Sequence, residues 1–161
     1  MKRTIQDQFK QIVGSDSILT DSEDLFTYSF DAAVHEPEIP SCVLIPRDAE
    51  AVSKIIKLCS ENAIPVTARG AGTNLSGGAI PNKKGVVILT TKLDSIHEIN
   101  EQDMYAVVQP GVITADLAAR VESAGLFYPP DPGSQAVSTL GGNVAENAGG
   151  LRGLKYGVTK D

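Results

Sequence analysis

The placement of glycine is the feature that most constrains what this chain can fold into. The sequence has 15 glycines in 161 residues, and only Gly14 precedes residue 70. Four lie between Gly70 and Gly78 and six between Gly141 and Gly157. Glycine lets the backbone adopt positive φ or approach another group closely, at an entropic cost that a purely structural loop seldom needs twice. We therefore expect a ligand at these two windows.

Composition and charge exclude several classes of protein. A hydrophobic fraction of 42% and a charged fraction of 21% are ordinary for a globular domain, and no apolar run approaches the roughly 20 residues of a membrane span. The net charge is −6 and the chain contains no Trp, which disfavours a nucleic-acid binder. No apolar signal core follows the first ten residues, so we expect a cytoplasmic protein.

Strand and helix patterns alternate along the chain. Apolar residues at helical spacing predict helices at 3–13, from an Asp48 cap to Asn62, and from a Thr114 cap to Gly125. Short apolar runs predict strands at 43–45, 64–68, 86–89 and 105–109. A further short helix is expected after a cap at Ser138 or Thr139, whereas residues 21–40 are predicted to be a surface lead-in. The pattern indicates a mixed α and β chain.

The first glycine window directly follows the predicted strand 64–68, a placement typical of loops that bind phosphate through backbone N–H groups. A dinucleotide fingerprint would begin at Gly70, but Leu75 stands where its third glycine is required. A Walker loop fails as well, because Gly78 stands where its lysine belongs. Both familiar nucleotide motifs are therefore broken.

The second glycine window offers a complementary set of groups. Residues 138–143 supply hydroxyls, bare backbone amides and an amide side chain at a predicted helix start, which suits an anion. Two such turns, far apart in the sequence, fit a diphosphate held from two sides. For either loop alone, a tight turn with no ligand is the alternative.

Several ordered blocks resemble a known family: Arg69–Thr73, Leu75–Gly78, Val107–Val112, Tyr128–Pro132, Gly141–Ala145, Asn147–Gly150 and Lys155–Thr159. From about Tyr28 onward the chain is similar to the flavin subunit of glycolate oxidase and to FAD-linked D-lactate and D-2-hydroxy-acid dehydrogenases. The resemblance implies an α+β fold, an FAD-binding domain of the p-cresol methylhydroxylase and vanillyl-alcohol oxidase type, made of two α+β subdomains.

The resemblance also implies a domain organisation. Residues 1–40 would be an N-terminal helix and lead-in, and residues 41–161 a partial FAD-binding domain. Family members continue beyond Asp161 with the rest of that domain and a separate substrate domain. We therefore expect a fold that is incomplete at its C-terminus, self-association of this chain, and no activity of the chain alone.

The function that the resemblance implies is the FAD-binding part of a flavin-dependent 2-hydroxy-acid oxidoreductase, which transfers hydride from a small hydroxy acid to FAD. The electron acceptor and the existence of an iron–sulfur partner subunit stay open. The alternative is a non-catalytic flavin- or nucleotide-binding module that has lost the catalytic domain.

By resemblance, candidate cofactor residues follow in both glycine windows and in the proline-rich loop between them. They are Arg69, Gly70, Ala71, Gly72, Thr73, Asn74, Gly77, Gly78, Pro130, Asp131, Pro132, Ser134, Thr139, Gly141, Gly142, Asn143, Asn147, Gly149, Gly150, Tyr156 and Gly157. Thr73 stands where relatives with covalent flavin often have histidine, so FAD is expected to bind noncovalently. Asn74 replaces a usual glycine, which is tolerable because Asn accepts positive φ.

No catalytic or metal-binding residue is predicted. His35 and His97 are the only histidines, and both lie in segments expected to be solvated. Asp131, between prolines, is expected to order its loop through backbone hydrogen bonds rather than to transfer protons. Cys42 and Cys59 lack metal or redox spacing and are predicted to be buried apolar side chains.

Overall fold

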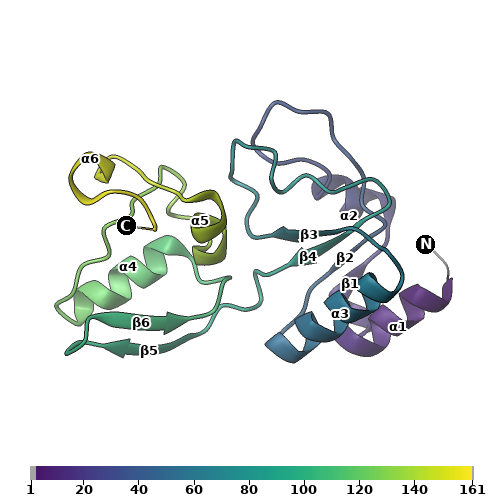
Figure 1. Cartoon of the computed structure of the whole chain (residues 1–161), viewed down its shortest axis with the longest axis horizontal. Helices are drawn as coiled ribbons and strands as arrows, with labels where there is room; N and C mark the ends of the chain where they lie inside the picture. Colours follow the sequence, from purple (N-terminus) through teal and green to yellow (C-terminus); the bar gives the residue numbers. More distant parts are fainter. Residues whose placement is uncertain (1–2, 161) are drawn as a thin grey trace. The chain divides into compact units, whose positions relative to one another are not determined.

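A computed structural model describes residues 3–160, which divide into two compact units between Lys92 and Leu93 (Figure 1). Each unit combines helices with strands and has its own hydrophobic core.

The first unit is a four-stranded sheet with helices on both faces. The strands occur in the spatial order β1 (Ile18–Leu19), β2 (Cys42–Leu44), β4 (Val86–Leu89) and β3 (Val66–Arg69). β1 is antiparallel to β2, and the other pairs are parallel. The helical elements are α1 (Arg3–Val13), a 3₁₀ turn (Ser15–Ser17), α2 (Ser22–Thr27) and α3 (Ala49–Glu61).

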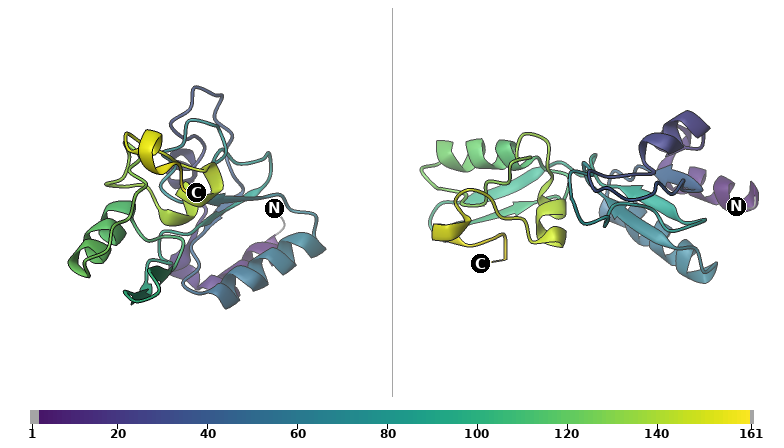
Figure 2. Two further views of the ribbon diagram at one scale, coloured as in Figure 1. Left: turned by 60° about the vertical axis from the view of Figure 1, so that its left-hand side comes forward. Right: turned by 90° about the horizontal axis from the view of Figure 1, so that it is seen from above.

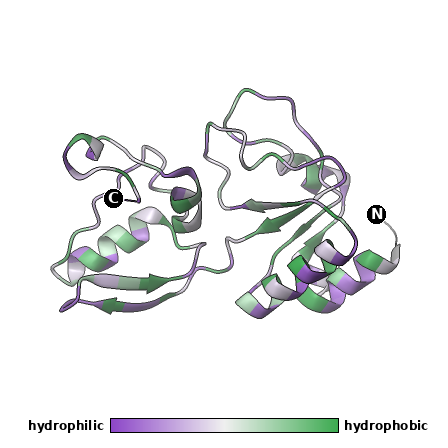
Figure 3. Ribbon diagram, in the orientation of Figure 1, coloured by the Kyte–Doolittle hydropathy of each residue, from purple (hydrophilic) through white to green (hydrophobic). Residues whose placement is uncertain are grey.

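Alternation along the central strands builds a core on each face of this sheet. Cys42 and Leu44 of β2, with Val86 and Ile88 of β4, pack with the side chains of α1 and α3. The intervening residues of the same strands pack with Leu25 of α2. α1 and α3 lie side by side (Figures 1 and 2), and β4 is hydrophobic along its whole length (Figure 3). The sheet therefore fixes where the segment after β3 emerges.

Helices α1 and α3 of this unit begin and end where the sequence predicts. The Asp48 carboxylate accepts a hydrogen bond from the Ala51 N–H at 2.7 Å and caps α3. Gly14, at φ 88°, follows the last residue of α1. The four predicted strands are all present, with starts shifted by at most two residues.

The segment 21–40 differs from the predicted surface lead-in. It contains α2, and Leu25, Ser29 and Asp31 are buried. Ser29 Oγ donates to the Phe26 carbonyl at 2.7 Å, and the Asp31 carboxylate accepts several hydrogen bonds. Polar groups satisfied in this way can be buried without regular secondary structure, which hydrophobic periodicity cannot reveal.

The second unit is an antiparallel hairpin, β5 (Ile96–Asn100) and β6 (Tyr105–Val108), with a bulge between Ile96 and Glu98. Its helices are α4 (Thr114–Ser123), α5 (Leu140–Glu146) and the short α6 (Gly153–Tyr156). Leu117 and Val121 of α4 pack on the apolar face of the hairpin, and α4 lies alongside β5 and β6 (Figure 1). β5 was not predicted, because its polar residues obscure the strand pattern.

One predicted cap is wrong and another is resolved. Ile113, not Thr114, is the N-cap of α4, and the buried Thr114 hydroxyl donates to the Ser138 carbonyl at 3.0 Å. Thr139 caps α5 by accepting from the Gly142 N–H at 3.3 Å.

Within residues 3–160, none of the helices has the length and hydrophobicity that a membrane span requires.

Candidate functional site

The glycine loop, residues 70–78, follows directly from β3 in the first unit. Gly72 has φ 72° and Gly77 φ 80°, a region that side chains rarely occupy. Within the described part of the chain, the backbone N–H groups of residues 71–75 donate to no acceptor. A run of five consecutive unpaired amides is the donor set that a phosphate-type anion needs.

The two long polar side chains of this loop are engaged by the protein itself. The Arg69 guanidinium is 8% exposed and donates from Nη1 to the carbonyls of Phe30, at 2.7 Å, and Ala79, at 3.4 Å. Asn74 Nδ2 donates to Asp31 Oδ2 at 2.7 Å. The loop therefore offers a ligand its backbone, while its side chains hold its shape.

Arg69 also places a positive charge against the loop backbone. Burial lowers the pKa of its guanidinium, while the nearby Asp31 carboxylate and Tyr28 raise that pKa. A guanidinium remains protonated in proteins despite such burial. A Cβ added to Gly72 would overlap Arg69 Nη2, so the charge lies against the backbone of the loop at Gly72.

In the second unit, Asp131 orders the proline-rich loop as the sequence predicts. Its Oδ1 accepts from the Arg152 N–H at 3.0 Å, and its Oδ2 lies 3.5 Å from Arg152 Nε. Arg152 in turn lies over the Phe127 ring, 5.1 Å from its centroid. These contacts join the segment around Pro130, Pro132 and Ser134 to the segment that contains Gly149 and Gly150.

The backbone N–H groups at the start of α5 are paired within the protein. The N–H groups of Leu140 and Gly141 each donate at 2.8 Å, to the carbonyls of Val112 and Pro110, and the Gly142 N–H donates to Thr139. The Asn143 side chain is buried and donates to Thr114 Oγ1 at 2.7 Å. Neighbouring backbone carbonyls and the cap thus already accept from these amides, and a contact of this helix start with a cofactor stays a prediction.

The remaining candidates of the second unit lie around α5 and α6. Asn147, at φ 51°, is the C-cap of α5, and its Oδ1 accepts from the Lys160 N–H at 3.2 Å. The Tyr156 ring packs on Phe127 at a centroid separation of 5.3 Å, and Gly157 ends α6. For these and the other candidate residues, a contact with a cofactor stays a prediction.

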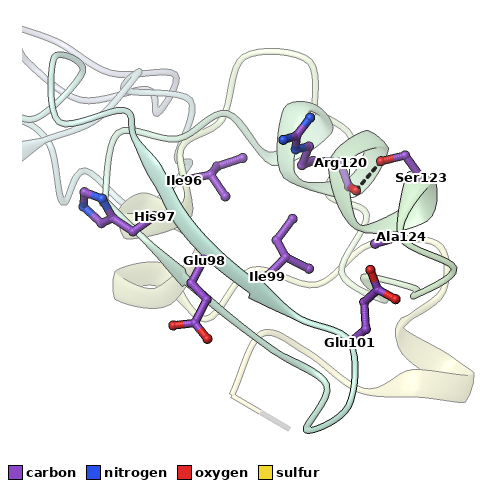
Figure 4. A pocket seen from close by; sticks show the side chains of 8 residues that line it. All are labelled: Ile96, His97, Glu98, Ile99, Glu101, Arg120, Ser123 and Ala124. Atoms are coloured by element: carbon purple, nitrogen blue, oxygen red, sulfur yellow. Dashed lines mark hydrogen bonds between the residues drawn. The ribbon is translucent and has the colours of Figure 1, made fainter.

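Neither histidine lies in a catalytic arrangement. His97 is exposed and lines a polar hollow of about 440 Å³ beside β5 and α4. Figure 4 shows Ile96 and Ile99 directed toward α4 and His97 directed away from it. The exposed His35 ring lies close to Gly77. The residues that the structure describes contain no group of three side chains able to hold a metal ion.

Buried thiols are confirmed at Cys42 and Cys59. Burial raises the pKa of Cys42 to about 12 and that of Cys59 to about 11. Both side chains belong to the core between the sheet and α1 and α3. They therefore act as apolar filling, as predicted.

The site residue that the sequence did not reveal is Asp31. It lies in a segment with no helical or strand periodicity, and a buried carboxylate is uncommon unless it is paired or hydrogen-bonded. One signal pointed to this segment, because the family resemblance begins near Tyr28 rather than at the first predicted strand.

Comparison with known proteins identifies the family. A model described as the FAD binding domain matches residues 40–161. The chain is 46% identical to glycolate oxidase subunit GlcD of Bacillus subtilis over 159 residues, 99% of this chain and 34% of that protein. It is 41% identical to the D-lactate dehydrogenase of Anaerostipes hadrus over 157 residues, 96% of this chain and 32% of that protein. The chain thus spans about a third of these relatives.

Solved structures confirm the predicted α+β fold. Alkyldihydroxyacetonephosphate synthase matches with a TM-score of 0.90 at 21% identity, over 100% of this chain and 32% of that chain. p-Cresol methylhydroxylase matches with a TM-score of 0.78 at 23% identity, over 92% of this chain and 30% of that chain. The family model, the relatives and the fold agree: this chain belongs to the FAD binding domain family of FAD-linked oxidoreductases.

Proposed function

We propose that this chain is the FAD-binding part of a flavin-dependent 2-hydroxy-acid oxidoreductase, and that its glycine loop binds the diphosphate of FAD. The observation that carries the proposal is the run of unpaired N–H groups at residues 71–75. In a folded protein, backbone donors are nearly always paired or open to a ligand or water. Five in succession, beside a guanidinium, favour an anion.

The donor set fits a diphosphate better than it fits a neutral ligand. Phosphate oxygens accept several hydrogen bonds at once, and bonds to an ionised acceptor are about twice as strong as neutral ones. The Arg69 charge adjacent to Gly72 adds electrostatic attraction. When bound, FAD supplies the hydride acceptor, while the residues of this loop bind and orient the cofactor.

The class of substrate is proposed from the relatives. Glycolate and D-lactate, which appear in the names of the two relatives above, are both 2-hydroxy acids. We propose the same class for the protein to which this chain contributes. No described residue is assigned to the substrate, and activity of this chain alone toward such acids is not expected.

The proposed attachment of FAD is noncovalent. Thr73 lies in the loop at the position where the resembled family can carry an attachment histidine, and threonine offers no ring nitrogen. Cys42 and Cys59 are buried, with thiol pKa values raised to about 12 and about 11, so neither presents a thiolate to a flavin. Precipitation with acid should therefore release all bound flavin into the supernatant. Yellow colour retained in the pellet would contradict this attachment.

The central test is a calorimetric titration of the chain with FAD and, separately, with NAD. FAD is expected to bind and NAD to bind far more weakly, because Leu75 breaks the dinucleotide fingerprint. Pyrophosphate should compete with FAD if the loop binds the diphosphate. Tight NAD binding without FAD binding would overturn the proposal.

A further inference from the structure

Residues 28–35 cover one side of the glycine loop and are named here the strap. The Tyr28 ring lies 5.6 Å from Arg69 Cζ, and the Phe30 carbonyl accepts from Arg69 Nη1 at 2.7 Å. The His35 ring approaches Gly77 so closely that a Cβ there would lie 2.9 Å from its Cδ2. The strap therefore contacts the loop near its beginning and near its end.

Asp31 is the centre of these contacts. Its carboxylate accepts from the Ala33 N–H at 2.9 Å, from Asn74 Nδ2 at 2.7 Å and from the Ala79 N–H at 3.3 Å. The side chain therefore ties the strap both to the middle of the loop and to the residue that follows it.

The burial of Asp31 requires all of these hydrogen bonds to be kept. The residue is only 8% exposed, and a buried carboxylate is tolerated only when hydrogen-bond donors surround it. Each donor must therefore stay in place for the charge to remain buried. The consequence is a loop whose path past Gly72 and Gly77 is set before any ligand arrives.

We infer that Asp31 is a positioning residue for the diphosphate loop and that the strap belongs to the cofactor site. The strap lies outside residues 40–161, the segment that the family model matches. The identity of the anion rests on the proposed function, whereas the control of the loop by Asp31 does not.

The negative charge of Asp31 and its hydrogen bonds predict opposite effects on FAD affinity, so a substitution can distinguish them. Asp31 is negative and lies beneath a loop proposed to bind an anion, so its charge alone would weaken binding. Asp31→Asn removes that charge at nearly constant volume. If charge dominated, affinity for FAD would rise. If position dominates, affinity falls, because an amide has one acceptor oxygen and its NH₂ group would face a donor.

The experiment compares the whole chain with Asp31→Asn, Asn74→Ala and the control Glu36→Gln. Glu36 is exposed and adjacent to the strap, so its substitution removes the same charge without removing a bond to the loop. FAD affinity is measured by quenching of flavin fluorescence. Cleavage by thermolysin at Leu75, which is 78% exposed, is followed without FAD by mass spectrometry.

Asp31→Asn should weaken FAD binding about tenfold and speed cleavage at Leu75 by a similar factor, since a lost bond to a charged group is large. Asn74→Ala removes the Asn74 Nδ2 bond to Asp31, together with a second one to Ser76 Oγ inside the loop, and should shift both readouts in the same direction by a smaller factor. Glu36→Gln should match the unsubstituted chain or bind FAD slightly more tightly. Affinity retained or increased in Asp31→Asn, with unchanged cleavage, would overturn the inference.

The two proposals fail separately. If the unsubstituted chain does not bind FAD, the proposed function is wrong, and the cleavage rates alone decide the role of Asp31. If Asp31→Asn fails to fold by circular dichroism, Asn74→Ala decides it, because that side chain is only half-buried. Unchanged cleavage at Leu75 in Asn74→Ala would then overturn the role.

Discussion

The two glycine windows of this chain look alike in sequence but differ in what their backbone N–H groups do. In the loop after β3, the amides of residues 71–75 have no acceptor within residues 3–160. At the start of α5, the amides of residues 140–142 all donate to protein acceptors. Glycine content is thus a poor guide to ligand binding, whereas the pairing of the amides is informative.

The reason for glycine also differs between the windows. Gly72 combines positive φ with contact to the buried Arg69 guanidinium, in the loop proposed to bind the diphosphate. Gly141 lies in the first turn of α5 against a rigid ring, where a Cβ would lie 2.6 Å from Pro110 Cβ. One glycine sets the path of the loop proposed to bind FAD, and the other permits a helix to pack.

The largest expected effect is on the free energy of unfolding, and it tests the packing role of Gly141. Gly141→Ala should lower the free energy of unfolding by about 2 to 3 kcal/mol, because the added methyl overlaps Pro110 in a packed turn. Helix propensity alone would raise stability by about 1 kcal/mol, so the sign identifies the clash. Urea unfolding followed by circular dichroism measures the change.

Gly142→Ala is the matched control for this substitution. A Cβ at this neighbouring helical position would meet only Thr139 Oγ1, at 3.2 Å. Its stability should stay within about 1 kcal/mol of the unsubstituted chain, since propensity offsets the mild contact. Equal stability of the two variants would show that packing on Pro110 does not require Gly141.

The next effect concerns binding rather than stability. Gly72→Ala forces a side chain into a left-handed conformation, which costs about 1 to 2 kcal/mol, and pushes against Arg69. We expect FAD affinity to fall about tenfold because the amides of the loop shift. Fluorescence titration of FAD checks this. Unchanged affinity, with the protein folded, would show that the loop conformation does not matter to the cofactor.

The sequence predicted the regular elements well, because their signals are local. The Asp48 cap, the Gly14 stop and the apolar stripe of α3 all depend on neighbours within a few residues. Short apolar runs likewise marked β2 and β4. The bulged, polar strand β5 was not predicted, because Glu98 and Asn100 break the apolar pattern.

The candidate site was predictable only in part. The sequence and its family resemblance located both glycine windows, but no local pattern states whether an amide is already paired. The partners of Gly141 and Leu140 are the carbonyls of Pro110 and Val112, contributed by a distant turn. The burial of Asp31 depends on Asn74 and Ala79, more than forty residues away. Such pairings exist only after tertiary folding.

A smaller effect compares the caps of the two units. Asp48→Ala removes the side-chain acceptor of α3, and Thr139→Ala removes that of α5. Each should cost about 1 kcal/mol of stability. If the start of α5 is structural, as its paired amides indicate, Thr139→Ala lowers stability in the absence of any flavin. Urea unfolding without ligand measures both. If only Asp48→Ala lowered the free energy of unfolding, the Thr139 cap would not stabilise α5.

The smallest expected effect is a dependence of stability on pH that comes from the two thiols. Cys42 and Cys59 both belong to the first unit. Burial raises the pKa of Cys42 and Cys59 to about 12 and about 11, above the usual value of 9.0. As the pH rises toward 9, the unfolded thiols ionise while the folded ones stay protonated, so stability present below pH 9 is progressively lost. At pH 9 the loss is about 0.4 kcal/mol per thiol. Urea unfolding at pH 7 and pH 9 measures the change in the free energy of unfolding. This free energy should decrease more in the unsubstituted chain than in a Cys42→Ala, Cys59→Ala variant. The variant is the control, because it has the same lysines and tyrosines, which titrate in both proteins. Identical decreases would mean that the thiols are not shielded, and that the core between the sheet and helices α1 and α3 admits water.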